Sequence, residues 1–212
     1  MAKRMDDTET LGEFLRDVAM NVVVIVTVFL IVHFFIAAPF QVVGNSMIST
    51  LQDDEYIVVS KLEYLIGNPG RGDIVVFHPP QNADDYYIKR VIGIPGDTVQ
   101  LKSGDVFVNG LKIGESFLDE GMITCLVPHM KSCPGDNRTY QVPDDQYFVL
   151  GDNRHGSSDS RGWFDDDNKP SPFVTRSSIQ GKTRMVVFPL PSVRIIDQTS
   201  VFDEALNGLR AN

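Results

Sequence analysis

Residues 18–38 form an apolar run long enough to cross a membrane, and this run constrains the fold of the chain more than any other feature. Only Asn21, Thr27 and His33 interrupt it, and a helix of roughly 20 apolar residues spans the hydrocarbon core of a bilayer. These polar residues are evenly spaced, so they lie on different sides of a helix and form no polar stripe. We interpret His33 as a neutral imidazole near the membrane interface. The sequence therefore predicts a transmembrane helix over 18–38.

Two features indicate that this helix is an uncleaved anchor with a defined direction. Its apolar run is longer than the roughly 7–15 residues of a cleavable secretory leader. Lys3, Arg4 and Arg16 precede the helix, and the next positive residue after it is Lys61. Because positive residues favour the cytoplasmic side, residues 1–17 are expected in the cytoplasm and the chain after the helix outside.

The chain beyond the anchor has the pattern of a β-rich domain. Segments rich in β-branched and aromatic residues, separated by Pro-Gly, Gly-Asp and Asn-Gly turns, predict strands. These segments are 55–64, 73–78, 86–94, 99–104, 105–113, 146–152 and 182–190. Asn109-Gly110 predicts a type I′ hairpin turn. We expect a mainly β fold, a curled antiparallel sheet or barrel over 39–200, with a loop-rich insertion at 114–145 and a tail at 201–212.

Charge and cysteine content narrow the possible partners and the compartment. The formal net charge is −9 and no basic stripe is present, so nucleic acid is not an expected partner. Cys125 and Cys133 are close in the sequence, and outside the cytoplasm such a pair favours a disulfide. A metal site that uses both cysteines and His129 is less favoured because it would lack a fourth ligand.

Lys89 occupies an unusual place in the segment "DDYYIKRVIGIPGD" at 84–97. On a strand it shares a face with Tyr87 and Val91, which is the apolar side. In one interpretation the amine reaches water along its own aliphatic stem. In the other, burial keeps the amine neutral so that it can act as a general base.

A serine nucleophile could use such a base. Ser46 lies in "GNSMISTL" at 44–51, and enough chain separates it from Lys89 for strands to bring the two together. A serine hydroxyl is a poor nucleophile until a base takes its proton, and a lysine can be that base only when burial lowers its pKa. Only residues 39–45 separate the anchor from Ser46, so the reaction would occur within about 25 Å of the bilayer.

Four segments together resemble the bacterial type I signal peptidases, the membrane-anchored serine proteases that remove signal peptides from exported proteins. In the order found in that family, they are "GNSMISTL" at 44–51, "RGDIVVF" at 71–77, "YIKRVIGIPGD" at 87–97 and "GDNRHGSSDSR" at 151–161. The resemblance covers residues 39 to about 190, and the anchor and its orientation agree with it.

The resemblance implies roles for five residues. Ser46 matches the family's nucleophile, Lys89 its general base and Ser157 the serine that orients this base. Asp159 and Arg161 match the charged pair that supports the site, and the backbone N–H of Ser46 would stabilise the oxyanion. No metal or other cofactor is implied.

The resemblance also implies the substrate and the location. Substrates would be preproteins whose signal peptides have small residues at the first and third positions before the cleaved bond. The protein would work as a monomer in the bacterial cytoplasmic (inner) membrane, with a single span, a cytoplasmic N-terminus and an extracytoplasmic catalytic domain. Its partners would be signal peptides and the lipid bilayer.

Two positions depart from the family pattern. Ser49 stands where the family usually has proline, and we expect the serine to cost the loop some preorganisation. Gly44 stands where some members have a serine that helps to form the oxyanion hole, so the N–H of Ser46 would contribute more.

Other functions are open to a chain of this kind. Self-cleaving repressors and pilus-assembly peptidases also use a Ser/Lys pair, but the repressors lack an anchor and the S-x-D-S-R segment argues against both. A non-catalytic anchored β-module that binds secreted chains would not need a lysine on an apolar face. A Ser-His-Asp triad of Ser158, His155 and Asp159 is disfavoured because residues so close in sequence rarely form one.

Overall fold

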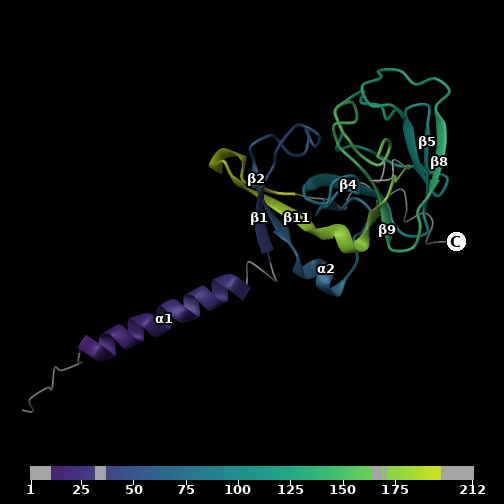
Figure 1. Cartoon of the computed structure of the whole chain (residues 1–212). Helices are drawn as coiled ribbons and strands as arrows, with labels where there is room; N and C mark the ends of the chain where they lie inside the picture. Colours follow the sequence, from purple (N-terminus) through teal and green to yellow (C-terminus); the bar gives the residue numbers. More distant parts are fainter. Residues whose placement is uncertain (1–10, 32–36, 164–168, 170, 197–212) are drawn as a thin grey trace, which may run out of the picture.

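The computed structural model describes residues 11–31, 37–163, 169 and 171–196. A long helix, α1 (Leu11–Ile31), extends away from a β-rich domain that contains two antiparallel sheets (Figure 1). The eight-stranded sheet has the order β1 (Ala37–Gln41), β2 (Tyr56–Ser60), β11 (Ile179–Phe188), β3 (Ile74–Phe77), β4 (Tyr87–Gly93), β9 (Gln146–Leu150) and β10 (Val174–Thr175), with β12 (Arg194–Ile195) paired to β11. The four-stranded sheet has the order β7 (Leu111–Lys112), β6 (Asp105–Val108), β5 (Thr98–Lys102) and β8 (Asn137–Gln141). The expected mainly β, antiparallel fold is confirmed.

The element boundaries differ from the predicted ones at three places. A short helix, α2 (Leu62–Ile66), replaces the end of the strand predicted over 55–64. It forms because Tyr64 turns inward, is buried, and donates a hydrogen bond to Asp73 at 2.8 Å. Strand β8 lies inside the predicted loop-rich insertion, and β1 begins at Ala37, within the run predicted as a membrane helix. Each difference depends on a partner strand or side chain that the local sequence pattern does not contain.

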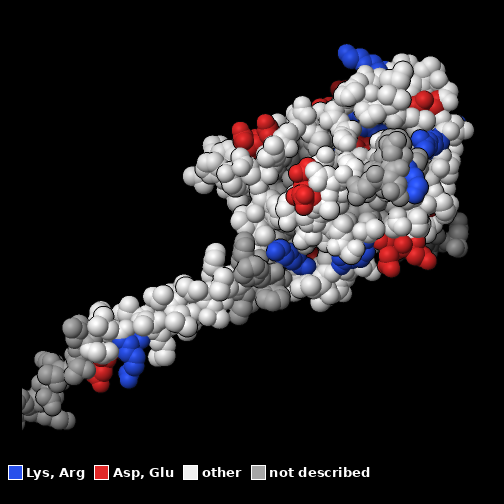
Figure 2. All heavy atoms as spheres, viewed as in Figure 1, with Lys and Arg blue, Asp and Glu red and all other residues white. Residues whose placement is uncertain are grey.

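The N-terminal helix has apolar side chains exposed on all sides. Val23, Ile25 and Phe29 are each more than 60% exposed, at 63%, 67% and 64%. Figure 2 shows that α1 is almost free of charge beyond its N-terminal end. Within the part of the chain that the structure describes, no helix combines the length and the apolar character needed to cross a membrane. The predicted span includes residues 32–36, with His33, which lie outside the described residues, as does the predicted tail.

The eight-stranded sheet is covered on both faces, which fixes the strands that hold the candidate site. Along β3 the side chains alternate: Ile74 and Val76 join one buried cluster, while Val75 and Phe77 join another. β4 pairs with β3 on one side and β9 on the other, so it is an interior strand. Two short 3-10 helices, η2 (Arg176–Ser178) and η3 (Leu190–Ser192), flank β11.

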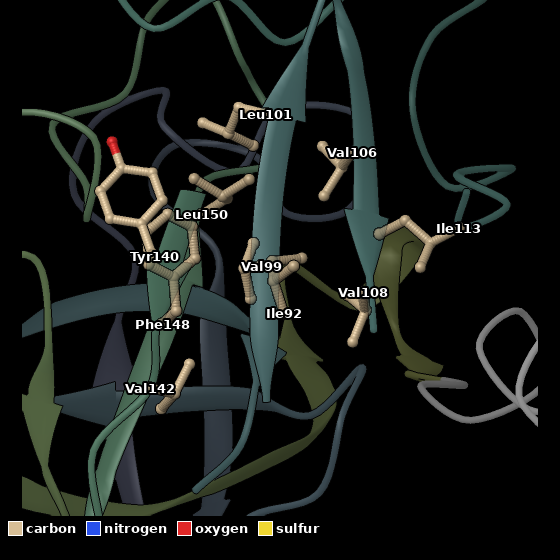
Figure 3. Close-up of a cluster of buried hydrophobic side chains, with 10 residues drawn as sticks. All are labelled: Ile92, Val99, Leu101, Val106, Val108, Ile113, Tyr140, Val142, Phe148 and Leu150. Carbon is tan, nitrogen blue, oxygen red and sulfur yellow. The ribbon is translucent and has the colours of Figure 1, made fainter. Parts of the chain in front are cut away.

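A third buried cluster joins the two sheets (Figure 3). Ile92, Phe148 and Leu150 come from the eight-stranded sheet, and they pack against side chains of β5 and β6 such as Val99 and Val106. The cluster fixes the four-stranded sheet against β4 and β9. The predicted hairpin turn is confirmed at the edge of this sheet, where Asn109 and Gly110 both have positive φ, at 52° and 84°.

The insertion is cross-linked. Cys125 and Cys133 form a disulfide with their Cα atoms 5.5 Å apart. Among the described residues, the one group of side chains spaced like metal ligands is Cys125, Cys133 and Asp136. The disulfide occupies both sulfur atoms, so this group lacks the thiolates that a metal would need.

Candidate active site

Ser46 and Lys89 lie in direct contact. Lys89 is in the middle of β4, opposite Val75 of β3, and its side chain extends toward the loop that follows β1. Its Nζ donates hydrogen bonds to Ser46 Oγ at 2.8 Å and to the carbonyl of Ile88 at 2.9 Å. The structure therefore brings together two residues that are 43 positions apart in the sequence.

Lys89 is buried, which decides between the two interpretations of its position. The residue is 3% exposed, so the interpretation in which the amine reaches water is wrong. Burial lowers the pKa of Lys89 from 10.5 to about 8, because the charged form loses its hydration. The carboxylates of Asp159 and Asp152 oppose this shift in part by favouring the ammonium. With this pKa, about a tenth of the molecules have a neutral amine at pH 7 and about half at pH 8.

The loop that presents Ser46 is held by its own turns and by a second loop. The N–H of Leu51 donates to the carbonyl of Met47 at 2.8 Å, which closes a helix-like turn after Ser46. From the loop after β9, the N–H of Asn153 donates to the Ser46 carbonyl and its side-chain amide donates to the Asn45 carbonyl, both at 3.0 Å. These bonds fix the serine main chain relative to β4 and β9.

Both departures from the family pattern lie at turns with positive φ. Gly44 has φ of +91° and Ser49 has φ of +89°. Proline is restricted to φ near −65°, so the turn at Ser49 is one that proline could not form. The expected loss of preorganisation at Ser49 stays a prediction. Gly44 donates its N–H to Asp53 Oδ1 at 2.7 Å, which fixes the start of the loop.

Ser157 lies close to the nucleophile without contacting the lysine in the predicted way. The two hydrogen bonds described for Lys89 Nζ go to Ser46 and Ile88. The Ser157 hydroxyl is buried beside Asp159 and favours its ionised form, but it has no partner at good hydrogen-bond geometry in the described part of the chain. An orienting contact between Ser157 and Lys89 stays a prediction.

Asp159 and Arg161 form a buried, two-pronged ion pair. Arg161 Nε and Nη2 each donate to one oxygen of Asp159 at 2.8 Å. Burial alone would raise the pKa of Asp159, but the charge and hydrogen bonds of Arg161 and the N–H of Gly151 outweigh it and lower the pKa. The pair therefore remains charged and stabilises the conformation of the loop after β9, which contains both residues.

A cavity of about 530 Å³ opens at Ser46 and Lys89. Its lining is mostly apolar and comes from β1, the following loop, β3 and β4. The apolar residues of the lining are Phe40, Val42, Val43, Met47, Val76 and Ile88. Tyr86 and Tyr87 complete one side, and Tyr86 packs edge-on against Phe40 with ring centroids 5.2 Å apart. Such a lining favours uncharged side chains next to the serine.

Comparison with known proteins identifies the family. The sequence model of the family described as signal peptidase, peptidase S26, matches residues 15–188. The chain belongs to this family. It is 36% identical over 177 residues to signal peptidase I S of Bacillus subtilis, covering 83% of this chain and 90% of that protein. It is 35% identical over 167 residues to the probable signal peptidase I-2 of Synechocystis, covering 76% and 68% of the two chains. A solved signal peptidase I from Enterococcus faecalis covers 55% of this chain and 97% of its own, with 29% identity and a TM-score of 0.42.

As a member of the S26 family, the protein is a serine peptidase. Its site contains a second ion pair that the sequence reasoning missed. Arg90 donates from Nε and Nη2 to the two oxygens of Asp152 at 2.9 and 2.7 Å, and both side chains are buried. Asp152 also accepts a hydrogen bond from Thr50, in the loop that presents Ser46. Both charged residues stand inside matched segments, next to Lys89 and Gly151, but nothing local in the sequence indicates that they pair.

Proposed function

We propose that this S26 peptidase cleaves signal peptides from exported preproteins, with Ser46 as the nucleophile and Lys89 as the general base. The observation that supports this most directly is the buried lysine amine 2.8 Å from the serine hydroxyl. Neutral Lys89 takes the Ser46 proton as Ser46 Oγ attacks the carbonyl of the signal peptide's last residue. The amine then passes this proton to the leaving amino group as the peptide bond breaks, which leaves an acyl-enzyme.

The second half of the reaction uses the same base. Lys89, neutral again after the first product has left, removes a proton from a water molecule that attacks the acyl-enzyme, and Ser46 recovers its hydrogen. We assign the backbone N–H of Ser46 to the oxyanion. Ser157 is the proposed orienting group for Lys89, and the Asp159–Arg161 pair supports the loop that holds Ser157.

The lining of the cavity and the names of the relatives both support signal peptides as the substrate. The apolar lining beside Ser46 suits uncharged side chains, and the resemblance to the family adds that those at the first and third positions before the cleaved bond are small. Relatives at about 35% identity over most of their length are named signal peptidase I. Cleavage of signal peptides is therefore the activity that both the chemistry of the site and the family support.

We propose further that the chain is a monomeric, single-pass protein of the bacterial cytoplasmic membrane, with its catalytic domain outside the cytoplasm. Support comes from the apolar run over 18–38, from the positive residues that precede it, and from the exposed apolar surface of α1. A short connection from the anchor to Ser46 would place the serine near a signal peptide that lies in the bilayer.

The decisive experiment is cleavage of a preprotein by the detergent-solubilised full chain, with the new N-terminus read by mass spectrometry. Wild type is expected to cut after a small residue. Ser46→Ala and Lys89→Ala are expected to lose at least about a thousandfold in kcat while remaining folded. Lys102→Ala, on the exposed side of β5, is the matched lysine control and should retain activity.

A pH profile tests the role of the lysine in the same assay. Because only neutral Lys89 can accept the serine proton, kcat/KM should rise with pH and level off above an apparent pKa of about 8. Cleavage at the wild-type rate by Lys89→Ala would contradict the mechanism. Failure of wild type to cleave any of several preproteins would contradict the function.

A further inference from the structure

A second cavity, of about 420 Å³, adjoins the one at Ser46 and Lys89. Ser158 lines both cavities, so the two are neighbours along the protein surface. One wall of the second cavity is the loop after β9, from Gly156 to Gly162, and the other is the disulfide-bounded segment Val127, Pro128 and His129. Neither the proposed catalytic steps nor the signal-peptide residues before the cleaved bond account for this cavity.

Ser157, which lines the second cavity, lies close to the main chain of Ser46. Gly151 packs between the Ser46 carbonyl and Ser157: a Cβ added there would lie 2.5 Å from the carbonyl oxygen and 2.2 Å from Ser157 Oγ. Only a glycine fits such a gap. The next residues continue the connection, because Asn153 donates its N–H to the Ser46 carbonyl and accepts the N–H of Gly156 at 3.1 Å. The cavity wall and the serine are therefore held by one continuous set of contacts.

The wall opposite this loop is fixed to it by two buried arginines. Arg161 donates to the carbonyl of Cys125 at 3.0 Å, where the disulfide begins. Arg154 is fully buried, donates to the Gly151 carbonyl at 3.0 Å, and also contacts Thr124 and Glu115 in the insertion. The two walls cannot easily move apart, so the cavity is preformed.

We propose that the second cavity binds the substrate segment that follows the cleaved bond, the first residues of the mature exported protein. The inference rests on the proposed function, in which the substrate carbonyl lies at Ser46 and the chain continues in both directions. An extended chain advances about 3.3 Å per residue, so three residues reach about 10 Å beyond the serine. The mostly apolar first cavity suits the residues before the bond.

The second cavity offers mixed chemistry, which suits a segment of variable sequence. Its lining combines two glycines, two serines, Asp159 and His129 with the apolar side chains of Val127 and Pro128. Val127, at the rim, is 59% exposed in this structure. A side chain there would face the bound segment without taking part in catalysis, which makes Val127 the position from which to probe the cavity.

The test is a charge swap at Val127 in the detergent-solubilised full chain. Substrates share one signal peptide and have Lys or Glu, in turn, at each of the first four positions after the cleaved bond. The measured quantity is the ratio of kcat/KM for the Lys substrate to that for the Glu substrate. Val127→Glu should raise this ratio about tenfold at one or more positions, and Val127→Lys should lower it about tenfold, because opposite charges a few ångströms apart attract.

Val193 supplies the matched control, since it is an exposed valine, at 48%, located between η3 and β12. Val193→Glu and Val193→Lys should leave the ratio at every position unchanged. Unchanged ratios in both Val127 variants, or equal changes in the Val193 variants, would overturn the inference while the cleavage itself still supports the proposed function. Absence of cleavage by wild type would instead overturn the proposed function and this inference together.

Discussion

Burial of Lys89 lowers the stability of the fold while it lowers the pKa of the amine, as the proposed mechanism requires. The native state binds a proton at this site with a pKa of about 8, whereas the unfolded chain binds it near 10.5. Between these pH values the unfolded state holds more protons, so the free energy of unfolding rises with pH through this window. Below pH 8 the protein retains the full cost of burying the ammonium. The proposed general base therefore destabilises the fold at neutral pH.

Replacing Lys89 by methionine should stabilise the protein and abolish cleavage. Methionine is unbranched like lysine but one atom shorter and uncharged, so the free energy of unfolding at pH 7 should rise by up to about 3 kcal/mol, the free-energy equivalent of the pKa shift. The gain should shrink as the pH increases from 8 toward 10. Urea unfolding at pH 7 and 9.5 measures it. A variant that is no more stable than wild type at pH 7 would mean that the amine is hydrated in the folded protein.

Ser49 is a residue whose backbone conformation conflicts with its side chain. Its φ of +89° is unfavourable for an L-residue and acceptable for glycine. We expect Ser49→Gly to stabilise the protein by about 0.5–1 kcal/mol and Ser49→Pro to destabilise it by about 2 kcal/mol or more. Thermal unfolding of the three proteins tests this. A proline variant as stable as wild type would show that the loop adopts the proline-type turn after all.

At the scale of elements, the Arg90–Asp152 pair joins three segments around the site. Arg90 comes from β4, Asp152 from the loop after β9, and Thr50 from the loop after β1. Arg90 also donates to the Gly72 carbonyl at 3.0 Å, at the turn before β3. Because the charges are buried, removing one of them leaves the other without its partner.

A double-mutant cycle tests whether Arg90 and Asp152 are energetically coupled. Arg90→Met and Asp152→Leu should each lower the free energy of unfolding by about 3–5 kcal/mol, and the double variant should lose much less than their sum. The exposed pair Lys112–Asp105, with side chains 59% and 44% exposed, is the control, and Lys112→Met should cost less than about 1 kcal/mol. Additive losses in the Arg90–Asp152 cycle would contradict a coupled pair.

At the scale of the whole molecule, the chain divides into an apolar helix, which we propose as the membrane anchor, and a folded β-rich domain. We expect the full chain to stay with the membrane after alkaline carbonate extraction. Ile25→Lys, in the middle of the apolar run, should lower the membrane-bound fraction, because a central lysine costs about 2.5–3.5 kcal/mol of insertion. Ile195→Lys alters an isoleucine of β12 that is even more exposed, at 81% against 67% for Ile25, and should not lower this fraction. Release of wild type by carbonate would contradict the anchor.

Local patterns in the sequence determined the elements and the residue types of the site. Each of the seven predicted segments overlaps a strand, because the alternation of side chains and the chemistry of turns act over a few residues. The turn at Asn109-Gly110 is the clearest example. The four matched segments likewise indicated Ser46 and Lys89 through a resemblance, and the position of Lys89 on an apolar face raised the question of its charge.

Only the tertiary structure decided which residues become partners and whether the amine of Lys89 is buried. The insertion of β11 between β2 and β3 is a long-range pairing that no local window contains, and so is the Arg90–Asp152 pair. The segment around Tyr64, predicted as the end of a strand, forms a helix because Tyr64 has a partner nine residues away. The sequence left open whether the amine of Lys89 reaches water, because hydration depends on atoms that β3, β9 and two loops bring around it. Burial by those atoms is the physical reason that its pKa falls to about 8.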